Sequence, residues 1–203
     1  EMNALAHVVR CFEDNNITHV DGEINSTRDA EVINLELIFA DLENLNKRKE
    51  KIEKKLRSGD KDLANEFNLI DNFIKTLESG DFINMSVYSN KEDLKIIQSF
   101  QLLTAKPIFF IANVSDTESS RENLNDLLEY AKKMNQEVID VQIKLEEEIA
   151  SLEEQDKKDF LELEGIEDPV LNKIIKKGYE ILGLDTFFTD GPSELRAWTL
   201  KRG

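Results

Sequence analysis

The sequence predicts an α/β protein whose parallel sheet is interrupted by an inserted helical hairpin. Three observations support this class. Short, nearly continuous apolar runs at residues 4–12 and 107–112 are typical of strands buried in a parallel sheet. Between residues 29 and 77 the apolar residues recur instead at helical spacing. After residue 105, predicted strands and helices alternate, which is typical of a doubly wound α/β unit.

The composition is that of a folded protein with much charged helix surface. The 203 residues include 26 Lys+Arg and 42 Asp+Glu, for a formal net charge of −16, and 40% are hydrophobic, which argues against disorder. No run approaches the roughly 18 apolar residues that a membrane-spanning helix needs. The single cysteine, Cys11, excludes an internal disulfide and a cysteine-based zinc site, and it fits a reducing cytosol. The acidity disfavours nucleic-acid binding by the chain as a whole, although it does not describe local patches.

The first half of the chain predicts one strand followed by two long helices. The run at 4–12 predicts a buried strand that needs neighbouring strands on both sides. Gly59 is expected to stop the first helix and Asp60 to cap the second, and only Lys49 interrupts the apolar stripe, with its ammonium in water. We therefore expect an antiparallel hairpin of coiled-coil type within residues 25–104. Its stripe alternates by three and four residues, as a heptad seam does, through Leu35, Ile38, Leu42, Leu45, Ile52 and Leu56, then Leu63, Phe67, Ile70, Ile74 and Leu77.

The second half predicts a last helix of the insert, at 91–103, and then the rest of the α/β domain, which takes in residues 1–24 and 105–185. The elements expected in order are a helix at 91–103, a strand at 107–112, a helix at 119–134, a strand at 138–141, helices at 144–164 (interrupted near Glu154) and 169–182, and extended segments at 186–189 and 195–200 around a turn.

Few residues stand out as candidates for chemistry. No glycine-rich phosphate loop is present. We interpret His7 as a core residue, His19 as a structural loop residue and Cys11 as a small buried hydrophobe. The segment Asn113-Val114-Ser115-Asp116 follows a predicted strand at its carboxyl end, where open parallel sheets bind ligands. Taken alone, the segment is more typical of a capped loop between a strand and a helix than of a ligand site.

A local charge reversal marks the predicted tip of the hairpin. Residues 46–61 contain eight basic and three acidic side chains, a net charge of +5, which leaves −21 for the rest of the chain. Two interpretations stay open: a contact with phosphate groups of RNA or the ribosome, or a solvated face with i,i+4 ion pairs. A third use of the hairpin is dimerisation through its heptad arms. The patch that the first interpretation assigns consists of Lys47, Lys51, Lys54, Lys55 and Arg57.

Five segments in collinear order carry a family resemblance along the whole chain: residues 7–14, 19–22, 28–37, 102–107 and 196–199. Together they resemble the Obg-like ATPases of YchF type, a branch of the P-loop GTPases. Two departures from the family are Ser26, where a proline is usual, and Asp190, where an alanine is usual; both are expected in loops. The resemblance implies an incomplete parallel-sheet G domain with the helical hairpin inserted. It also implies a central piece of a longer protein, lacking the phosphate loop and most of a C-terminal TGS domain, whose first strands would be residues 186–203.

The resemblance also implies a nucleotide site. Asn113, Val114 and Asp116 align with the base-recognition motif, N-K-x-D in ordinary GTPases, and Gln142 falls in the last base-contacting loop. Family members drift toward Glu at the last motif position, which is associated with adenine; this chain keeps Asp116 but lacks the lysine, so ATP is expected over GTP.

For the intact protein, the resemblance implies slow hydrolysis of ATP or GTP with Mg²⁺ and a cytoplasmic role at the ribosome or with RNA. The catalytic residues and metal ligands are expected upstream, so this chain alone should be inactive, bind nucleotide without high affinity, and be monomeric.

Overall fold

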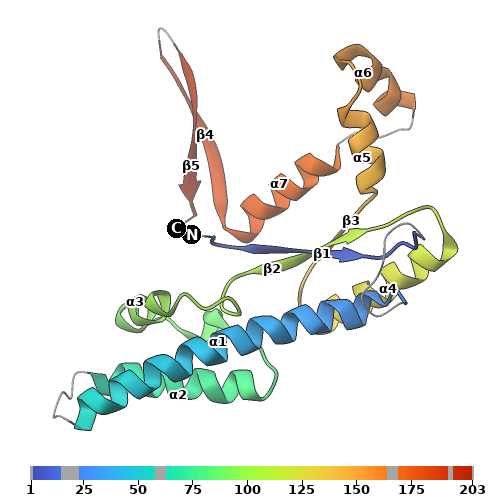
Figure 1. Ribbon diagram of the computed structural model, residues 1–203. Coiled ribbons are helices and arrows are strands. Elements are labelled where there is room, and N and C mark those ends of the chain that lie inside the picture. Colours follow the sequence, from blue (N-terminus) through green and yellow to red (C-terminus); the bar gives the residue numbers. More distant parts are fainter. Residues whose placement is uncertain (1, 15–22, 58–62, 164–168, 192–193, 203) are drawn as a thin grey trace. The chain divides into compact units, whose positions relative to one another are not determined.

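The computed structural model describes residues 2–14, 23–57, 63–163, 169–191 and 194–202 (Figure 1). The predicted cap residues Gly59 and Asp60, the histidine His19 and the resembling segment 19–22 lie outside this described part. The chain forms two compact units. The sheet unit comprises Glu1–Ala30 and Pro107–Gly203, and the helical unit comprises Glu31–Lys106.

The sheet unit is built on three parallel strands, as the sequence predicts. They are β1 (Leu5–Arg10), β2 (Ile108–Asn113) and β3 (Val138–Val141), in the order β1-β2-β3. Five of the six residues of β2 are buried, because a strand paired on both edges and covered on both faces has no surface left for water.

The expectation that the first strand is buried on both faces is wrong. Within β1, Val9 is 2% exposed, whereas Val8 is 55% exposed and Ala6 is also exposed. Among the described strands β1 pairs with β2 alone, and its burial alternates with the two-residue period of a strand that is covered on one face. Within the described residues, the continuous apolar run therefore overstates the burial of β1.

Helices cover both faces of β2. On one face α4 (Glu118–Lys133) packs Leu127 and Ala131 against Phe110. On the other, α7 (Val170–Ile181) packs against Phe109 and Ile111. Between β3 and α7 lie α5 (Ile143–Ala150) and α6 (Glu154–Leu163), separated as expected near Glu154.

The remaining parts of the sheet unit lie close to the predicted ranges. Strands β4 (Leu184–Asp190) and β5 (Leu195–Lys201) pair as an antiparallel hairpin. Two expected loop positions are corrected. Ser26 is the first residue of α1 (Ser26–Arg57), where its buried hydroxyl donates to the Asn123 carbonyl at 2.5 Å, and Asp190 is the last residue of β4.

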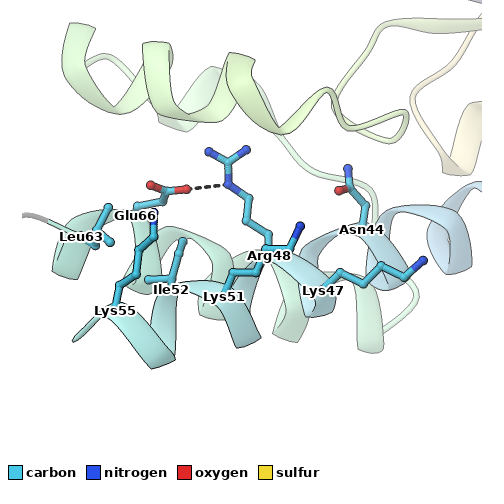
Figure 2. Close-up of a pocket in the computed structure, with 8 residues that line it drawn as sticks. All are labelled: Asn44, Lys47, Arg48, Lys51, Ile52, Lys55, Leu63 and Glu66. Carbon is cyan, nitrogen blue, oxygen red and sulfur yellow. Dashed lines mark hydrogen bonds and ion pairs between the residues drawn. The ribbon is translucent and has the colours of Figure 1, made fainter. Parts of the chain in front are cut away.

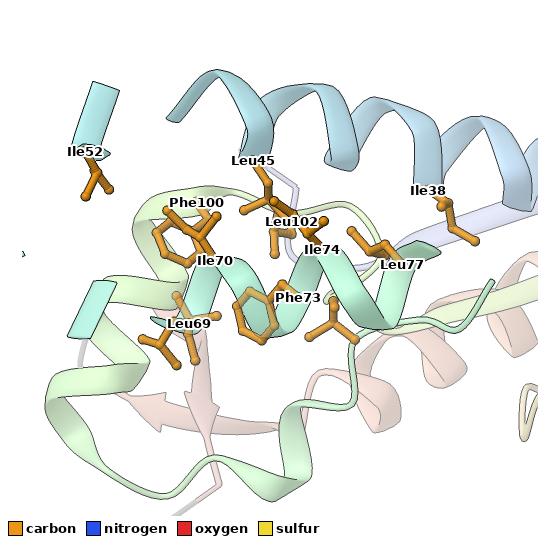
Figure 3. Close-up of a cluster of buried hydrophobic side chains, with 12 residues drawn as sticks. Ile38, Leu45, Ile52, Leu69, Ile70, Phe73, Ile74, Leu77, Phe100 and Leu102 are labelled. Atoms are coloured by element: carbon orange, nitrogen blue, oxygen red, sulfur yellow. The ribbon is translucent and has the colours of Figure 1, made fainter. Parts of the chain in front are cut away.

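Within its described residues the helical unit contains three α-helices, the two long ones and the one expected to begin at residue 91. They are α1, α2 (Ala64–Glu78) and α3 (Lys91–Phe100), with a short 3-10 helix, η2 (Met85–Val87), between the last two. Figure 3 shows α1 and α2 contributing side chains to one core. Most of the predicted seam is buried there, although Leu35 is 47% exposed.

The second face of α2 is the feature that the heptad seam does not predict. Leu69 and Phe73 are buried although neither belongs to the seam, because α2 also packs against α3. The ring of Phe73 meets Phe100 of α3 edge-on at 6.0 Å and Tyr88 at 5.5 Å between centroids. The helix α3 ends three residues before the expected position, since Gln101 adopts a left-handed conformation with φ of 57°.

Two acidic side chains connect α1 to its neighbours. The Lys49 ammonium forms an ion pair with Asp71 and lies 5.4 Å from the centroid of the Phe67 ring, instead of lying in water as expected. The buried carboxylate of Asp41 accepts hydrogen bonds from the backbone N–H groups of Leu103 (2.9 Å) and Thr104 (2.8 Å) and from the Thr104 hydroxyl (2.7 Å). This second contact fixes the segment that follows α3 onto α1.

Candidate functional site

The base-recognition candidates lie at the carboxyl edge of the three-stranded sheet. Asn113 is the last residue of β2, and Val114 and Asp116 follow in the loop that leads to α4. That loop is shaped by its own hydroxyls: Thr117 caps α4 by accepting from the Ser120 N–H at 3.3 Å, and the Ser120 hydroxyl accepts from the Ser115 N–H at 2.9 Å.

The parallel register brings the loops after β2 and β3 together. Asn113 pairs in register with Val141, and the Val114 N–H donates to the Val141 carbonyl at 2.8 Å. The Asn113 side-chain oxygen accepts from the Ile143 N–H at 3.3 Å, at the start of α5. All four predicted residues, including Gln142, therefore lie at one edge of the sheet.

The fourth residue contacts the motif directly. The Gln142 amide nitrogen donates to an Asp116 carboxylate oxygen at 2.9 Å, across 26 residues of sequence. Asn113 and Gln142 are half-buried, whereas Asp116 is exposed. Amides both donate and accept and a carboxylate accepts, so the group can bind the mixed donor and acceptor edge of a purine.

The two core candidates, His7 and Cys11, are packed as expected. The imidazole of His7 lies 5.2 Å from the Phe110 ring, and burial lowers its pKa. Cys11 is fully buried, and this burial raises the pKa of its thiol to about 11, so the thiol stays protonated and unreactive near neutral pH. His7 lies within β1, whereas Cys11 follows the carboxyl end of β1, where its backbone N–H donates to the Asn113 carbonyl at 2.9 Å.

Within the described ranges, no cluster of three or more His, Cys, Asp or Glu side chains is arranged to hold a metal ion. In the same described residues, no helix combines the length and the apolar character needed to cross a membrane.

A second candidate site lies in the helical unit. Figure 2 shows a pocket of about 450 Å³, which we call the basic groove. Of the predicted patch, Lys47, Lys51 and Lys55 line it, whereas Lys54 and Arg57 do not. Its lining residues are Asn44, Lys47, Arg48, Lys51, Ile52, Lys55, Leu63 and Glu66.

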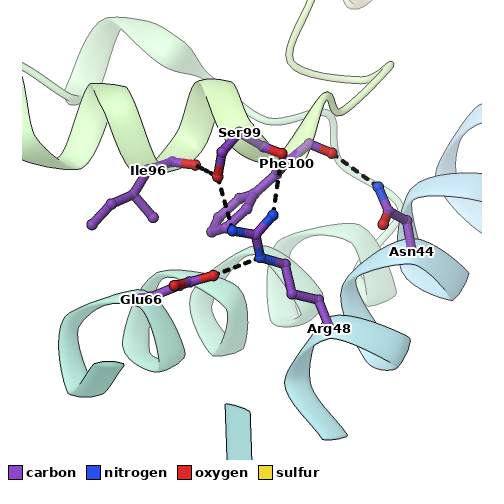
Figure 4. Close-up of polar contacts among 6 residues, drawn as sticks. All are labelled: Asn44, Arg48, Glu66, Ile96, Ser99 and Phe100. Carbon is purple, nitrogen blue, oxygen red and sulfur yellow. Dashed lines mark hydrogen bonds and ion pairs between the residues drawn. The ribbon is translucent and has the colours of Figure 1, made fainter. Parts of the chain in front are cut away.

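Arg48 is a structural residue of this surface that the sequence does not single out. Its guanidinium donates to the Glu66 carboxylate at 2.5 Å and to the carbonyl and hydroxyl of Ser99 at 3.1 and 2.9 Å (Figure 4). It also lies 4.6 Å from the centroid of the Phe100 ring. Arg48 therefore joins α1, α2 and α3, and its charge is balanced by Glu66.

The remaining basic side chains have features of both interpretations of the basic segment, a solvated helix face with ion pairs and a surface for phosphate groups. Lys47 pairs with Glu43 at 2.5 Å and Arg57 with Glu53 at 4.0 Å, each four residues apart, as on a solvated helix face. Lys47, Lys51 and Lys55 nevertheless recur every four residues along the groove, so they lie close to one line on the helix.

Curated relatives match this chain along its whole length. No protein-family model matches the chain. The "Ribosome-binding ATPase YchF" of Bacillus subtilis is 44% identical over 207 residues, covering 100% of this chain and 56% of the relative. The protein of the same name from Escherichia coli O157:H7 is 37% identical over 204 residues, again covering 100% of this chain and 56% of the relative.

A solved structure agrees with these relatives. The YchF GTPase of Schizosaccharomyces pombe superposes with a TM-score of 0.80 at 28% identity, covering 99% of this chain and 56% of that one. The chain thus spans about half the length of the proteins that it matches.

Proposed function

The chain matches the YchF family of Obg-like ATPases along its whole length in sequence and in fold, and from this premise we propose that it serves a ribosome-associated nucleoside triphosphatase. It supplies the base-recognition segment and the helical arm. Residues 1–24 and 105–185 are assigned to a G domain, 25–104 to the helical insert and 186–203 to the first strands of a TGS domain. The observation that carries the proposal is the meeting of Asn113, Asp116 and Gln142 at one edge of the sheet.

The proposed roles of this chain and of the rest of the protein follow from the chemistry of phosphoryl transfer. That reaction needs a phosphate cradle, a lysine, Mg²⁺ ligands and a positioned water. We assign these groups to the part of the longer relatives that this chain does not span. The whole protein would then hydrolyse Mg²⁺-bound ATP or GTP slowly in the cytoplasm, while this chain orients the base.

Each edge residue has a distinct role in this proposal. The Asn113 oxygen holds the start of α5, which leaves the amide nitrogen of the same side chain as the group that donates to a purine. The backbone of Val114 contacts the base edge, and the Asp116 carboxylate is an acceptor for donor groups of the base.

The substitution Asn113→Ala in the full-length protein should weaken binding of both ADP and GDP by about tenfold or more, because it removes a base contact and the anchor of the neighbouring loop. Isothermal titration calorimetry measures both affinities. The control is Asn65→Ala, which alters an exposed asparagine on α2 bonded to Asp93. Unchanged affinity for both nucleotides in the Asn113 variant would contradict the placement of the site.

A second function, contact with the phosphate backbone of RNA, is supported by the basic groove. Lysines four residues apart on a helix are separated by about 6 Å along its axis, a spacing comparable with that between successive phosphates of a polynucleotide strand. Charge contacts of this kind need no reading of sequence. The relatives' names describe them as ribosome-binding, which fits an RNA-facing surface on this arm.

Neutralising the groove should weaken association with ribosomes in a salt-dependent way. Changing Lys47, Lys51 and Lys55 together to glutamine removes about three phosphate contacts. The magnitude of the negative slope of log K against log salt should therefore decrease by roughly two to three, and the affinity should decrease by about tenfold or more. Co-sedimentation with ribosomes over a salt series measures the slope. The control carries the same change at three exposed lysines elsewhere in the helical unit, Lys75, Lys91 and Lys95. Equal slopes for the two triple variants would contradict the proposal and would indicate that the groove is only a solvated face.

A further inference from the structure

We propose that Gln142 sets the base preference of the nucleotide site: by hydrogen bonding to Asp116 it presents an edge that fits adenine and withholds from guanine the carboxylate that guanine needs. This inference rests on the function proposed above. It concerns which base the site accepts, whereas that proposal concerns whether the site binds a nucleotide.

The hydrogen bond fixes the orientation of the Gln142 amide. Its nitrogen lies 2.9 Å from the Asp116 carboxylate oxygen. A carboxylate only accepts hydrogen bonds, so the amide must turn its nitrogen toward Asp116 and its oxygen away. The second N–H of the same nitrogen and the amide oxygen are then the groups that Gln142 offers to a ligand.

The surrounding contacts hold both partners in place. Gln142 precedes α5, but its side chain forms no hydrogen bond that caps this helix; the Ile143 N–H is bound instead by Asn113. The Val114 N–H is bound by the Val141 carbonyl, so the loops that carry Asp116 and Gln142 are joined at their origins. The Gln142 side chain therefore does not cap α5, and the two loops hold it next to Asp116.

The two purines differ in what this pair can offer them. Guanine presents two adjacent donors, N1–H and the 2-amino group, which match the two oxygens of a carboxylate. Gln142 competes for one of those oxygens, so guanine must displace it. Adenine presents a donor, the 6-amino group, beside an acceptor, N1. An amide matches this arrangement with its oxygen and its N–H, whereas a carboxylate has no donor for N1.

Fold alone does not decide between the bases, since proteins of this fold carry both names: the bacterial relatives are called ATPases and the Schizosaccharomyces pombe structure is called a GTPase. A residue that interacts with the carboxylate of the motif is therefore well placed to set the preference.

The test compares the affinities of the full-length protein for ADP and GDP by isothermal titration calorimetry. Gln142→Ala should free the Asp116 carboxylate and remove the amide, so the ratio of the two affinities should move toward GDP by about tenfold or more. Gln142→Met, which keeps the length of the side chain without its polar atoms, should move the ratio in the same direction. A matched control exists in the same unit: Gln155 on α6 donates to Asp159 at 3.0 Å, and Gln155→Ala should leave the ratio unchanged.

A double variant tests whether Gln142 acts through Asp116. In an Asp116→Ala background, Gln142→Ala should no longer increase the affinity for GDP, because no carboxylate is left to release. An unchanged ratio in both Gln142 variants, or an equal shift in Gln155→Ala, would overturn the inference while leaving the nucleotide site intact. Failure of the unaltered protein to bind either nucleotide would overturn the proposed function and this inference with it.

Discussion

Replacing Asp41 with alanine is expected to lower the free energy of unfolding of the helical unit by about 3–4 kcal/mol. The Asp41 carboxylate is 2% exposed and accepts three hydrogen bonds from Leu103 and Thr104. Removing it leaves two backbone N–H groups and one hydroxyl of a buried segment without these acceptors. Each unsatisfied buried group costs about 1–3 kcal/mol, and the losses overlap because the segment can relax.

An isosteric variant separates hydrogen bonding from packing. Asp41→Asn keeps the shape of the side chain but turns an amide donor toward an N–H or hydroxyl donor, so it should also destabilise, by about 2 kcal/mol. Hydrogen exchange of amides in α1, α2 and α3 reports on this unit separately from the sheet unit. Glu43→Ala, an exposed carboxylate on the same helix, should have little effect. If Asp41→Asn behaves like the unaltered protein, the carboxylate does not hold the segment after α3.

The strong local patterns of this sequence were sufficient to predict its architecture. The strands β2 and β3, the helix α4 and the helices α1 and α2 follow from the apolar period, which acts over a few residues. The features that the sequence did not predict depend on residues that are distant in the chain. The burial of β1 depends on the number of strands that pair with it, and the role of Asp41 depends on groups 62 and 63 residues away.

The nucleotide site shows the same difference between local sequence signals and contacts between distant residues. The position of Asn113 and Asp116 at the end of an apolar run is a local signal, so they were predicted as candidates. The contact between Asp116 and Gln142 spans 26 residues and depends on the register of β2 and β3, which the sequence does not state. In the basic segment, Arg48 looks like its neighbours; only its place opposite Glu66 and Phe100 makes it structural.

Phe73 gives the second large expected effect, because it lies on the face of α2 that the heptad seam leaves out. Its side chain is 1% exposed and contacts the rings of Tyr88 and Phe100. Phe73→Ala removes a large buried ring from between α2 and α3, and the cavity cannot close without moving a helix. We therefore expect a loss of about 4 kcal/mol in the free energy of unfolding, measured by urea denaturation with hydrogen exchange to localise the change.

A matched phenylalanine on the same unit provides the control. Phe39 on α1 is 64% exposed, so Phe39→Ala should change stability by no more than about 0.5 kcal/mol. If α1 and α2 formed a self-sufficient two-helix seam, the two alanine variants would behave alike, and amides of α3 would exchange as fast in the unaltered protein as in Phe73→Ala. A large, specific loss at Phe73 instead means that α3 is part of the folding unit. It would then follow that the rigidity of the helix bearing Lys47, Lys51 and Lys55 depends on α3, to which Arg48 also binds.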